Sequence, residues 1–233
     1  MLTHPPRQTV AFMRQIAESQ PTAETFLGVL GEGNWGGPGS SGDSLVMRYL
    51  NDVMATLLTA LDSRARLMRA PPRPGMGSIF LLNNLSYVRR EILSSQVSDL
   101  LGEPCEDELN RKMRTAKSAY LEIWSPLVSA LLDAGTEQST AAGAIKAAVK
   151  GGASTERRET KDRFVRFFDA FEEVESLHHA ARLDANEHEL RERLKDEVDR
   201  MVVPTYSKFL ARHRHGDFSK SAQRSLPIPQ RSR

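Results

Sequence analysis

The chain has 233 residues, of which 39% are hydrophobic and 27% charged, and its formal net charge is +2. These values are typical of a soluble globular protein with one large domain or two small ones. The single cysteine, Cys105, excludes an internal disulfide framework and a cysteine-based zinc site, and no stretch is long and apolar enough to cross a bilayer. Because the N-terminal residues also lack the apolar segment of a secretory signal, we expect a cytoplasmic protein.

Apolar residues recur at helical spacing through the first half of the chain. The pattern predicts a helix over residues 7–18, followed by a glycine-rich loop. A long amphipathic helix follows over residues 43–69, with Ser41 or Asp43 as its N-cap and a proline-rich stop after it. A further helix over residues 81–92 is nearly all apolar in its first half, which predicts that neighbours cover it on most sides.

The helical pattern continues in the second half of the chain with two interruptions. Residues 106–133 form an apolar stripe that contains Pro126, where we expect a kink or a break. Residues 134–155 are rich in small side chains and indicate a flexible connection. A phenylalanine-rich helix is predicted over residues 156–180.

The last predicted helix begins with Asn186 and Glu189, which are spaced as a capping box. Pro204 predicts a bend within it, and residues 216–233 are expected to form a basic, disordered tail. No stretch alternates apolar and polar residues in the manner of a strand. The sequence therefore predicts an all-α fold of antiparallel helical bundles.

Two motifs suggest chemistry but lack the context that the chemistry needs. Gly31, Gly33 and Gly36 spell GxGxxG, yet no strand precedes them and no βαβ pattern surrounds them, so we interpret this segment as a loop. His178 and His179 lack the HExxH spacing of a metal site, and adjacent residues point about 100° apart around a helix. We interpret them as a solvated pair.

The sequence contains no arrangement typical of an enzyme. There is no GxSxG nucleophile motif, and the carboxylates next to Cys105 disfavour its thiolate. Acidic residues alternate with lysine and arginine along the helices, which is typical of solvated surface. We therefore expect a protein that is not an enzyme and that uses no metal or other cofactor.

Positive charge is concentrated at the C-terminal end. Residues 204–233 hold seven lysines and arginines and a single acid, a net charge of +6 that leaves −4 for the rest of the chain. Such a segment suits an anionic surface, either lipid head groups or nucleic acid, and the alternative is a solvated tail without a partner. Nucleic acid is disfavoured because there is no helix-turn-helix pattern and no aromatic residues alternate with the cations.

Five segments carry recognisable motifs. They are residues 31–35 (GEGNW), 79–88 (IFLLNNLSYV), 117–124 (KSAYLEIW), 161–173 (KDRFVRFFDAFEE) and 190–209, which includes LRERL and VPTYSKF. In this order they resemble the C-terminal domain of the Exo70 subunit of the exocyst. The likeness extends over residues 4–215, and we assign residues 1–215 to one helical domain.

The resemblance implies stacked antiparallel helical bundles that form part of an elongated rod without catalytic activity. It implies an exocyst subunit that tethers secretory vesicles at the plasma membrane, where it is peripheral and binds phosphatidylinositol 4,5-bisphosphate. Other exocyst subunits and a Rho-type GTPase are the implied protein partners. The basic residues at the matching positions, which would bind the lipid, are Lys208, Arg212, Arg214, Lys220 and Arg224.

The chain departs from the family pattern at both ends. The longer N-terminal helical part of the family is not matched, and residues from Leu226 onward replace its YTPEDL-like segment. A second hypothesis therefore stays open, in which the chain is a helical protein-interaction scaffold. It would bind a Rho-type GTPase or other exocyst subunits without direct lipid binding.

Overall fold

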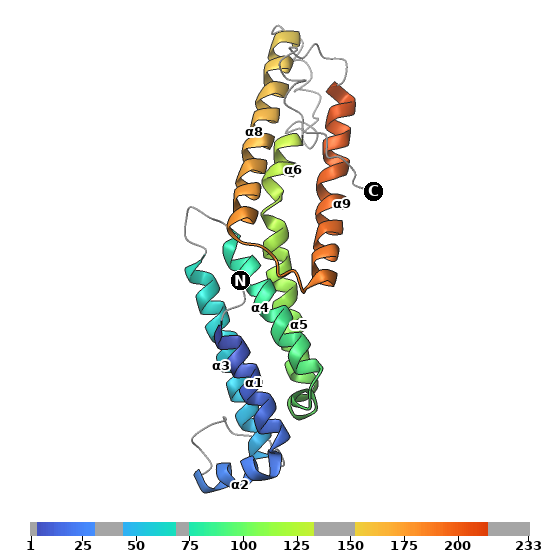
Figure 1. The fold of residues 1–233 in the computed structure, drawn as a ribbon. Helices are drawn as coiled ribbons and strands as arrows, with labels where there is room; N and C mark the ends of the chain where they lie inside the picture. Colours follow the sequence, from blue (N-terminus) through green and yellow to red (C-terminus); the bar gives the residue numbers. More distant parts are fainter. Residues whose placement is uncertain (1–3, 31–43, 69–74, 133–151, 214–233) are drawn as a thin grey trace, which may run out of the picture. The chain divides into compact units, whose positions relative to one another are not determined.

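The computed structural model of the chain describes residues 4–30, 44–68, 75–132 and 152–213. Every regular element in these ranges is an α-helix, so the predicted all-α fold is confirmed (Figure 1). The helices are α1 (His4–Glu18), α2 (Gln20–Leu30), α3 (Leu45–Leu67), α4 (Met76–Leu93), α5 (Val97–Glu122), α6 (Ser125–Leu131), α8 (Gly152–Ala180) and α9 (His188–His213). None of these helices combines the length and the apolar character that a membrane span needs.

The chain divides into two compact units. Unit 1 comprises Met1–Ser125 with Glu172–Val198, and unit 2 comprises Pro126–Phe171 with Asp199–Arg233. Helices α8 and α9 therefore contribute one part of their length to each unit. The predicted flexible connection and the predicted tail fall mainly on residues 134–151 and 216–233, which lie outside the described residues. Residues 152–155, which were expected in the connection, belong to α8 instead.

Helix α4 forms the centre of unit 1. It packs against α1, α3 and α5, and in Figure 1 it lies between α3 and α5. The residues from Gly77 to Leu85 are all buried, so the expected burial of this segment on most sides is confirmed. A helix with one face in water carries polar, exposed residues on that face. Consecutive residues point in all directions around the helix axis, so their burial requires neighbours on every side of this part of α4.

The start of α3 is held by two side chains, Ser44 and Glu24, and neither is a cap that the sequence predicted. Ser44 is its N-cap, and its Oγ accepts a hydrogen bond of 3.1 Å from the Met47 backbone N–H. The expected caps, Ser41 and Asp43, are therefore wrong by one to three residues. Glu24 of α2 accepts from the backbone N–H groups of Leu45 and Val46 at 2.7 and 3.1 Å, so a helix missed by the periodicity caps the next one.

Two breaks divide the region of α5 and α6. Gly102 takes a left-handed conformation with φ +65°, two residues before Pro104, so α5 is kinked near its start. It begins at Val97, nine residues before the predicted start. The predicted break is confirmed, because α5 ends at Glu122 and a new helix, α6, begins at Ser125. Pro126 is the second residue of α6, where a backbone N–H would have no partner within the helix, so proline is tolerated there.

Glycine is required at the entrance to α4. Gly75 has φ +95°, which disfavours any residue with a Cβ. A Cβ there would also collide with the Cδ1 of Ile123 and come within 2.7 Å of Leu177 Cδ2. The close approach lets α4, the end of α5 and α8 meet inside unit 1.

Unit 2 is built on aromatic contacts between α8 and α9. The rings of Phe164 and Phe209 meet edge-on at 4.9 Å, and those of Phe167 and Tyr206 stack at 5.2 Å between centroids. The order of these pairs shows that the two helices run antiparallel. Helix α9 continues through Pro204 in this unit, and it begins at His188 rather than at the predicted capping box of Asn186.

Candidate functional site

Two of the five predicted lipid-binding residues lie in the described part of the chain. Lys208 and Arg212 stand on the last two turns of α9, one turn apart, and both are exposed. Arg214, Lys220 and Arg224 lie outside the described residues. Of the five predicted lipid-binding residues, the structure therefore describes the surroundings of Lys208 and Arg212.

Helix α8 adds cations beside them that the sequence did not assign to a site. Lys161 precedes Phe164 by three residues and Arg212 follows Phe209 by three, so both lie about 4.5 Å beyond the Phe164–Phe209 ring pair. Arg157 and Arg158 continue α8 in the same direction for another turn. The start of α8 and the end of α9 thus bring separate basic segments to one end of unit 2 (Figure 1).

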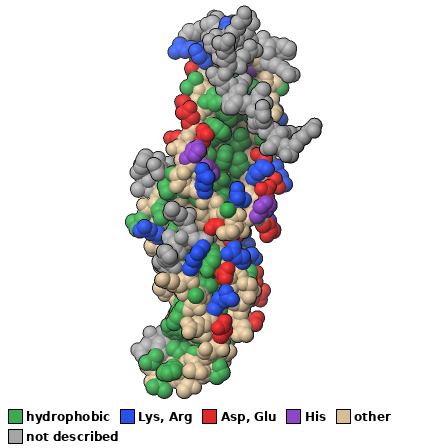
Figure 2. Space-filling model, viewed as in Figure 1, with side chains coloured by type: hydrophobic (Ala, Val, Ile, Leu, Met, Phe, Trp, Pro, Cys, Tyr) green, Lys and Arg blue, Asp and Glu red, His purple; other side chains and the backbone are tan. Residues whose placement is uncertain are grey.

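We call this set the basic end. Its members are Arg157, Arg158, Lys161 and Arg163 on α8 and Lys208 and Arg212 on α9. Against these six cations, the same stretches of helix carry two acids, Glu159 and Asp162, so the net charge is +4. Figure 2 shows Lys and Arg side chains near the upper end of the molecule, over the first part of α8.

A second feature lies in unit 1, where a loop joins α8 to α9. Asn83 of α4 is fully buried, and its side chain holds this loop with two hydrogen bonds. Its Nδ2 donates to the Arg182 carbonyl at 2.9 Å, and its Oδ1 accepts from the Asp184 backbone N–H at 2.8 Å. One asparagine thereby satisfies a backbone donor and a backbone acceptor about 100 residues away in the sequence.

Glu187, at the end of the same loop, is fixed by α4 as well. One carboxylate oxygen accepts from the Ser86 hydroxyl and the other pairs with the Arg90 guanidinium. The predicted capping box is therefore wrong: Asn186 instead bonds the Asp184 carboxylate through its backbone N–H and its side-chain amide. These contacts set the path of the chain into α9.

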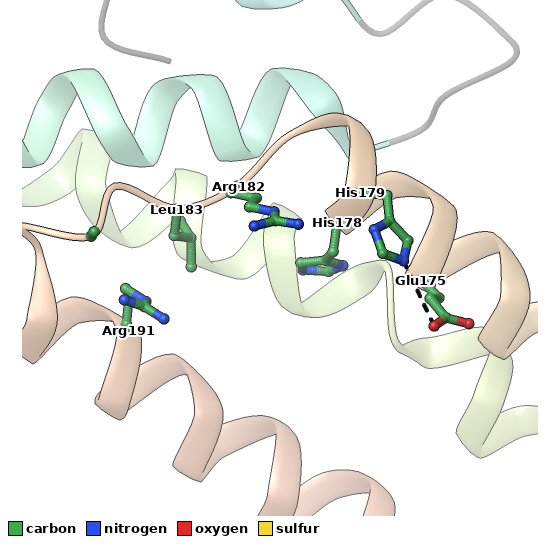
Figure 3. A pocket seen from close by; sticks show the side chains of 7 residues that line it. Glu175, His178, His179, Arg182, Leu183 and Arg191 are labelled. Carbon is green, nitrogen blue, oxygen red and sulfur yellow. Dashed lines mark ion pairs between the residues drawn. The ribbon is translucent and has the colours of Figure 1, made fainter. Parts of the chain in front are cut away.

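A cavity of about 490 Å³ opens beside this loop, and we call it the loop pocket. Figure 3 shows side chains from the end of α8, the loop and the first turn of α9 around it. Its lining residues are Glu175, His178, His179, Arg182, Leu183, Ala185 and Arg191.

The prediction of two solvated histidines is wrong for His178. Its Nδ1 donates to the Val174 carbonyl at 2.7 Å, which leaves Nε2 to accept from the Tyr120 hydroxyl at 3.0 Å. Burial raises the pKa of Tyr120, so this hydroxyl keeps its proton and remains a donor. The ring also lies against Trp124, at 5.7 Å between centroids. His179 is exposed, as expected, and lies 3.8 Å from the Glu175 carboxylate.

Cys105 is buried within α5, and its surroundings oppose ionisation. Burial, followed by the nearby Glu108 carboxylate, raises the pKa of the thiol to about 11. The sequence correctly predicted a disfavoured thiolate, although burial outweighs the carboxylates that suggested it. Among the described residues, no group of three or more His, Cys, Asp or Glu side chains is placed to hold a metal ion.

Comparison with known families gives one match that spans nearly the whole chain. The family is described as the Exo70 exocyst complex subunit, C-terminal part, and it matches residues 2–228. A curated relative from Yarrowia lipolytica, "Exocyst complex protein EXO70", is 27% identical over 183 residues, which is 78% of this chain and 28% of the relative. "Exocyst complex component EXO70A1" of Arabidopsis thaliana is 25% identical over 177 residues, 76% of this chain and 26% of the relative.

A solved structure supports the fold independently. Saccharomyces cerevisiae Exo70 superposes with a TM-score of 0.63 at 19% sequence identity, over 91% of this chain and 42% of that chain. At this level of identity the likeness concerns the fold. The chain spans less than a third of the length of the curated relatives named above.

Proposed function

Because the chain belongs to the Exo70 family of exocyst subunits, we propose that it acts as an exocyst subunit in tethering secretory vesicles at the plasma membrane. The role is one of docking rather than catalysis, and the protein works at the cytoplasmic face of that membrane. Other exocyst subunits are its first expected partners, and a Rho-type GTPase is a further one. The names of the relatives, which describe components of the exocyst complex, support this role.

The membrane is contacted, in this proposal, through the basic end. The observation that supports it best is the meeting of two basic segments, one from α8 and one from α9, at one end of unit 2. Phosphatidylinositol 4,5-bisphosphate is the proposed ligand because its head group concentrates several negative charges, which a cluster of lysines and arginines complements. Arg214, Lys220 and Arg224 extend the same set along the chain.

The expected strength follows from the charge. Each Lys or Arg near an anionic leaflet contributes about 1 kcal/mol, so a net charge of +4 provides about 4 kcal/mol, or roughly a thousandfold in affinity. Screening limits this attraction to distances of about 8 Å at physiological ionic strength. Membrane docking should therefore be reversible and sensitive to salt.

Liposome co-sedimentation at physiological salt tests this proposal. Vesicles would contain neutral lipid alone, added phosphatidylserine, or added phosphatidylinositol 4,5-bisphosphate. The triple variant Lys208→Glu, Arg212→Glu, Arg214→Glu is compared with the wild-type chain and with Lys195→Glu, which reverses an exposed lysine of α9 in unit 1.

The proposal predicts binding that prefers the bisphosphate vesicles, disappears in the triple variant and persists in Lys195→Glu. If the wild-type chain stays in the supernatant with all three vesicle types, direct lipid docking is wrong. The alternative, a scaffold that binds a GTPase or other exocyst subunits, would then be tested by pull-down with those partners.

A further inference from the structure

The part of unit 1 that contains the loop pocket is acidic. Residues 172–198 hold nine acids and four lysines and arginines, a net charge of −5. Two of the four cations are matched by acids on α9, since Arg193 pairs with Glu189 and Lys195 lies 3.9 Å from Glu192. The other two, Arg182 and Arg191, have no ion pair with any carboxylate in the described ranges.

These two arginines are the ones that line the loop pocket. Arg182 belongs to the α8–α9 loop, and the Asn83 amide fixes its backbone through the carbonyl oxygen. Arg191 stands in the first turn of α9, and its backbone N–H donates to the Glu187 carbonyl at 3.0 Å. Both guanidinium groups thus project from backbone that the contacts with α4 and the helix start hold in place (Figure 3).

The remaining lining residues are either apolar or already in contact with other groups of unit 1. Leu183 and Ala185 are apolar, and His178 uses both ring nitrogens for contacts within unit 1. His179 lies beside Glu175, the acid of the pocket. The available polar groups of the pocket are therefore two guanidinium forks, whose planar geometry matches the oxygens of phosphate groups.

We propose that the loop pocket binds a phosphate monoester carried by a side chain of a partner polypeptide, with Arg182 and Arg191 as its ligands. A phosphate monoester carries a charge of about −1.5 to −2 at pH 7 and three acceptor oxygens, enough to engage both forks. This site is independent of the basic end and of the lipid docking proposed above.

The acidic surroundings favour a phosphorylated polypeptide over a membrane. An anionic leaflet is an extended surface, and it would face the nine acids of residues 172–198 together with the two arginines. A single phosphorylated side chain reaches into a concave site and contacts the arginines while the rest of the peptide remains outside. Basic residues next to the phosphorylated one would in addition suit the surrounding acids.

A peptide titration of the full chain tests the proposal. The probes are a fluorescent phosphoserine peptide with flanking lysines and the same peptide without phosphate, both followed by fluorescence anisotropy. Amide resonances of the ¹⁵N-labelled chain locate the site. We expect binding that requires the phosphate, with the largest shifts at Arg182, Leu183, Ala185 and Arg191.

Substitutions then separate the pocket from its surroundings. The double variant Arg182→Ala, Arg191→Ala should weaken phosphopeptide binding at least tenfold. Arg193→Ala removes an exposed arginine of the same helix that pairs with Glu189, and it should stay within twofold of the wild type. Because all three side chains are exposed, an unchanged thermal unfolding temperature is expected for both variants and shows that they fold.

Three results would overturn the proposal. The first is equal binding of the phosphorylated and unphosphorylated peptides. The second is undiminished phosphopeptide binding in the double variant. The third concerns vesicles: a double variant that loses binding to phosphatidylinositol 4,5-bisphosphate while the wild type keeps it would assign the two arginines to a membrane surface. Failure of lipid docking in the wild type leaves the peptide result unaffected, so the two proposals fail separately.

Discussion

The basic end and the loop pocket are both built on α8 and α9, yet their charges have opposite sign. The basic end holds six cations and two acids, whereas residues 172–198 hold nine acids and four cations. In the first region the cations belong to two antiparallel segments that meet at one end of unit 2. In the second, neighbouring acids match Arg193 and Lys195 and leave two arginines at a cavity.

This difference teaches that a net charge of +2 for the whole chain says little about its surfaces. The attraction of an anionic partner depends on local charge, because screening limits its range. It therefore depends on which cations have carboxylate neighbours and on the local shape of the surface. A cationic end formed by two helices suits a membrane, and two arginines that line a cavity within an acidic surface suit one protruding anion.

The largest effect is expected from the α8 side of the basic end. The variant Arg158→Glu, Lys161→Glu changes the local charge by four units, and at about 1 kcal/mol for each unit it should weaken binding to bisphosphate vesicles a hundredfold or more. Flotation or co-sedimentation over a lipid titration measures it. Unchanged affinity would limit the lipid surface to α9 and the residues that follow.

The next effect concerns the support of the loop pocket. Asn83→Ala leaves the Arg182 carbonyl and the Asp184 N–H without their partner, which should lower the free energy of unfolding by about 2–3 kcal/mol. Urea unfolding followed by circular dichroism measures this loss. Asn51→Ala is the matched control, since the Asn51 amide bonds only the Met47 carbonyl in an exposed position and its loss should cost less than about 0.5 kcal/mol.

Asn83→Ala also sharpens the contrast between the two regions. It should reduce phosphopeptide binding, because the loop that carries Arg182 is released, and leave vesicle binding within twofold. Equal losses of both activities would show that the two regions depend on one another.

A smaller effect is expected from Cys105, inside unit 1. Its pKa of about 11 in the folded protein exceeds the ordinary 9.0, so the native state keeps the thiol proton at pH values where the unfolded chain has lost it. The stabilisation is complete below pH 9 and is lost as the pH rises toward 11, by roughly 2 kcal/mol. Urea unfolding at pH 8, 9.5 and 11 should show a shallower loss in Cys105→Ala than in the wild type. Parallel pH profiles would contradict the burial of this thiol.

The smallest effect is expected from an ion pair of unit 1. Lys117 of α5 pairs with Glu197 of α9, and about a third of each side chain is exposed. Glu197→Gln should therefore lower the free energy of unfolding by less than about 1 kcal/mol. Phosphopeptide binding should remain within twofold, because Glu197 does not line the pocket. A larger loss of stability would show that the acids of α9 are structural rather than part of its surface charge.

Much of the helical fold follows from the sequence because most helices bury a regular stripe. The apolar residues that recur every four positions from Leu45 to Ala65 predict α3, and the apolar first half of α4 predicts its burial. Helix α2 was not predicted because it buries no regular apolar stripe. Leu27 is its one buried residue, while Phe26, Val29 and Leu30 are exposed. The start of α5 was missed because Gly102 and Pro104 are ordinary signals of a helix end.

The candidate sites were only partly predictable, for a different reason. Counting charges locates Lys208 and Arg212, but it does not place Lys161 beside them, since that neighbourhood depends on the antiparallel pairing of α8 and α9. The loop pocket gave no signal in the sequence. Arg182 and Arg191 are nine residues apart among many acids, and Asn83, which holds the loop, lies about 100 residues earlier.

The most direct test of the contrast is a crossed measurement on two variants. One is Lys161→Glu, Lys208→Glu, Arg212→Glu at the basic end, and the other is Arg182→Ala, Arg191→Ala at the loop pocket. Each is titrated with bisphosphate vesicles and with the phosphoserine peptide at the same salt concentration. We expect the first variant to lose vesicle binding and keep peptide binding, and the second to do the reverse. If either variant loses both vesicle binding and peptide binding, the assignment of separate anion surfaces to the two regions is contradicted.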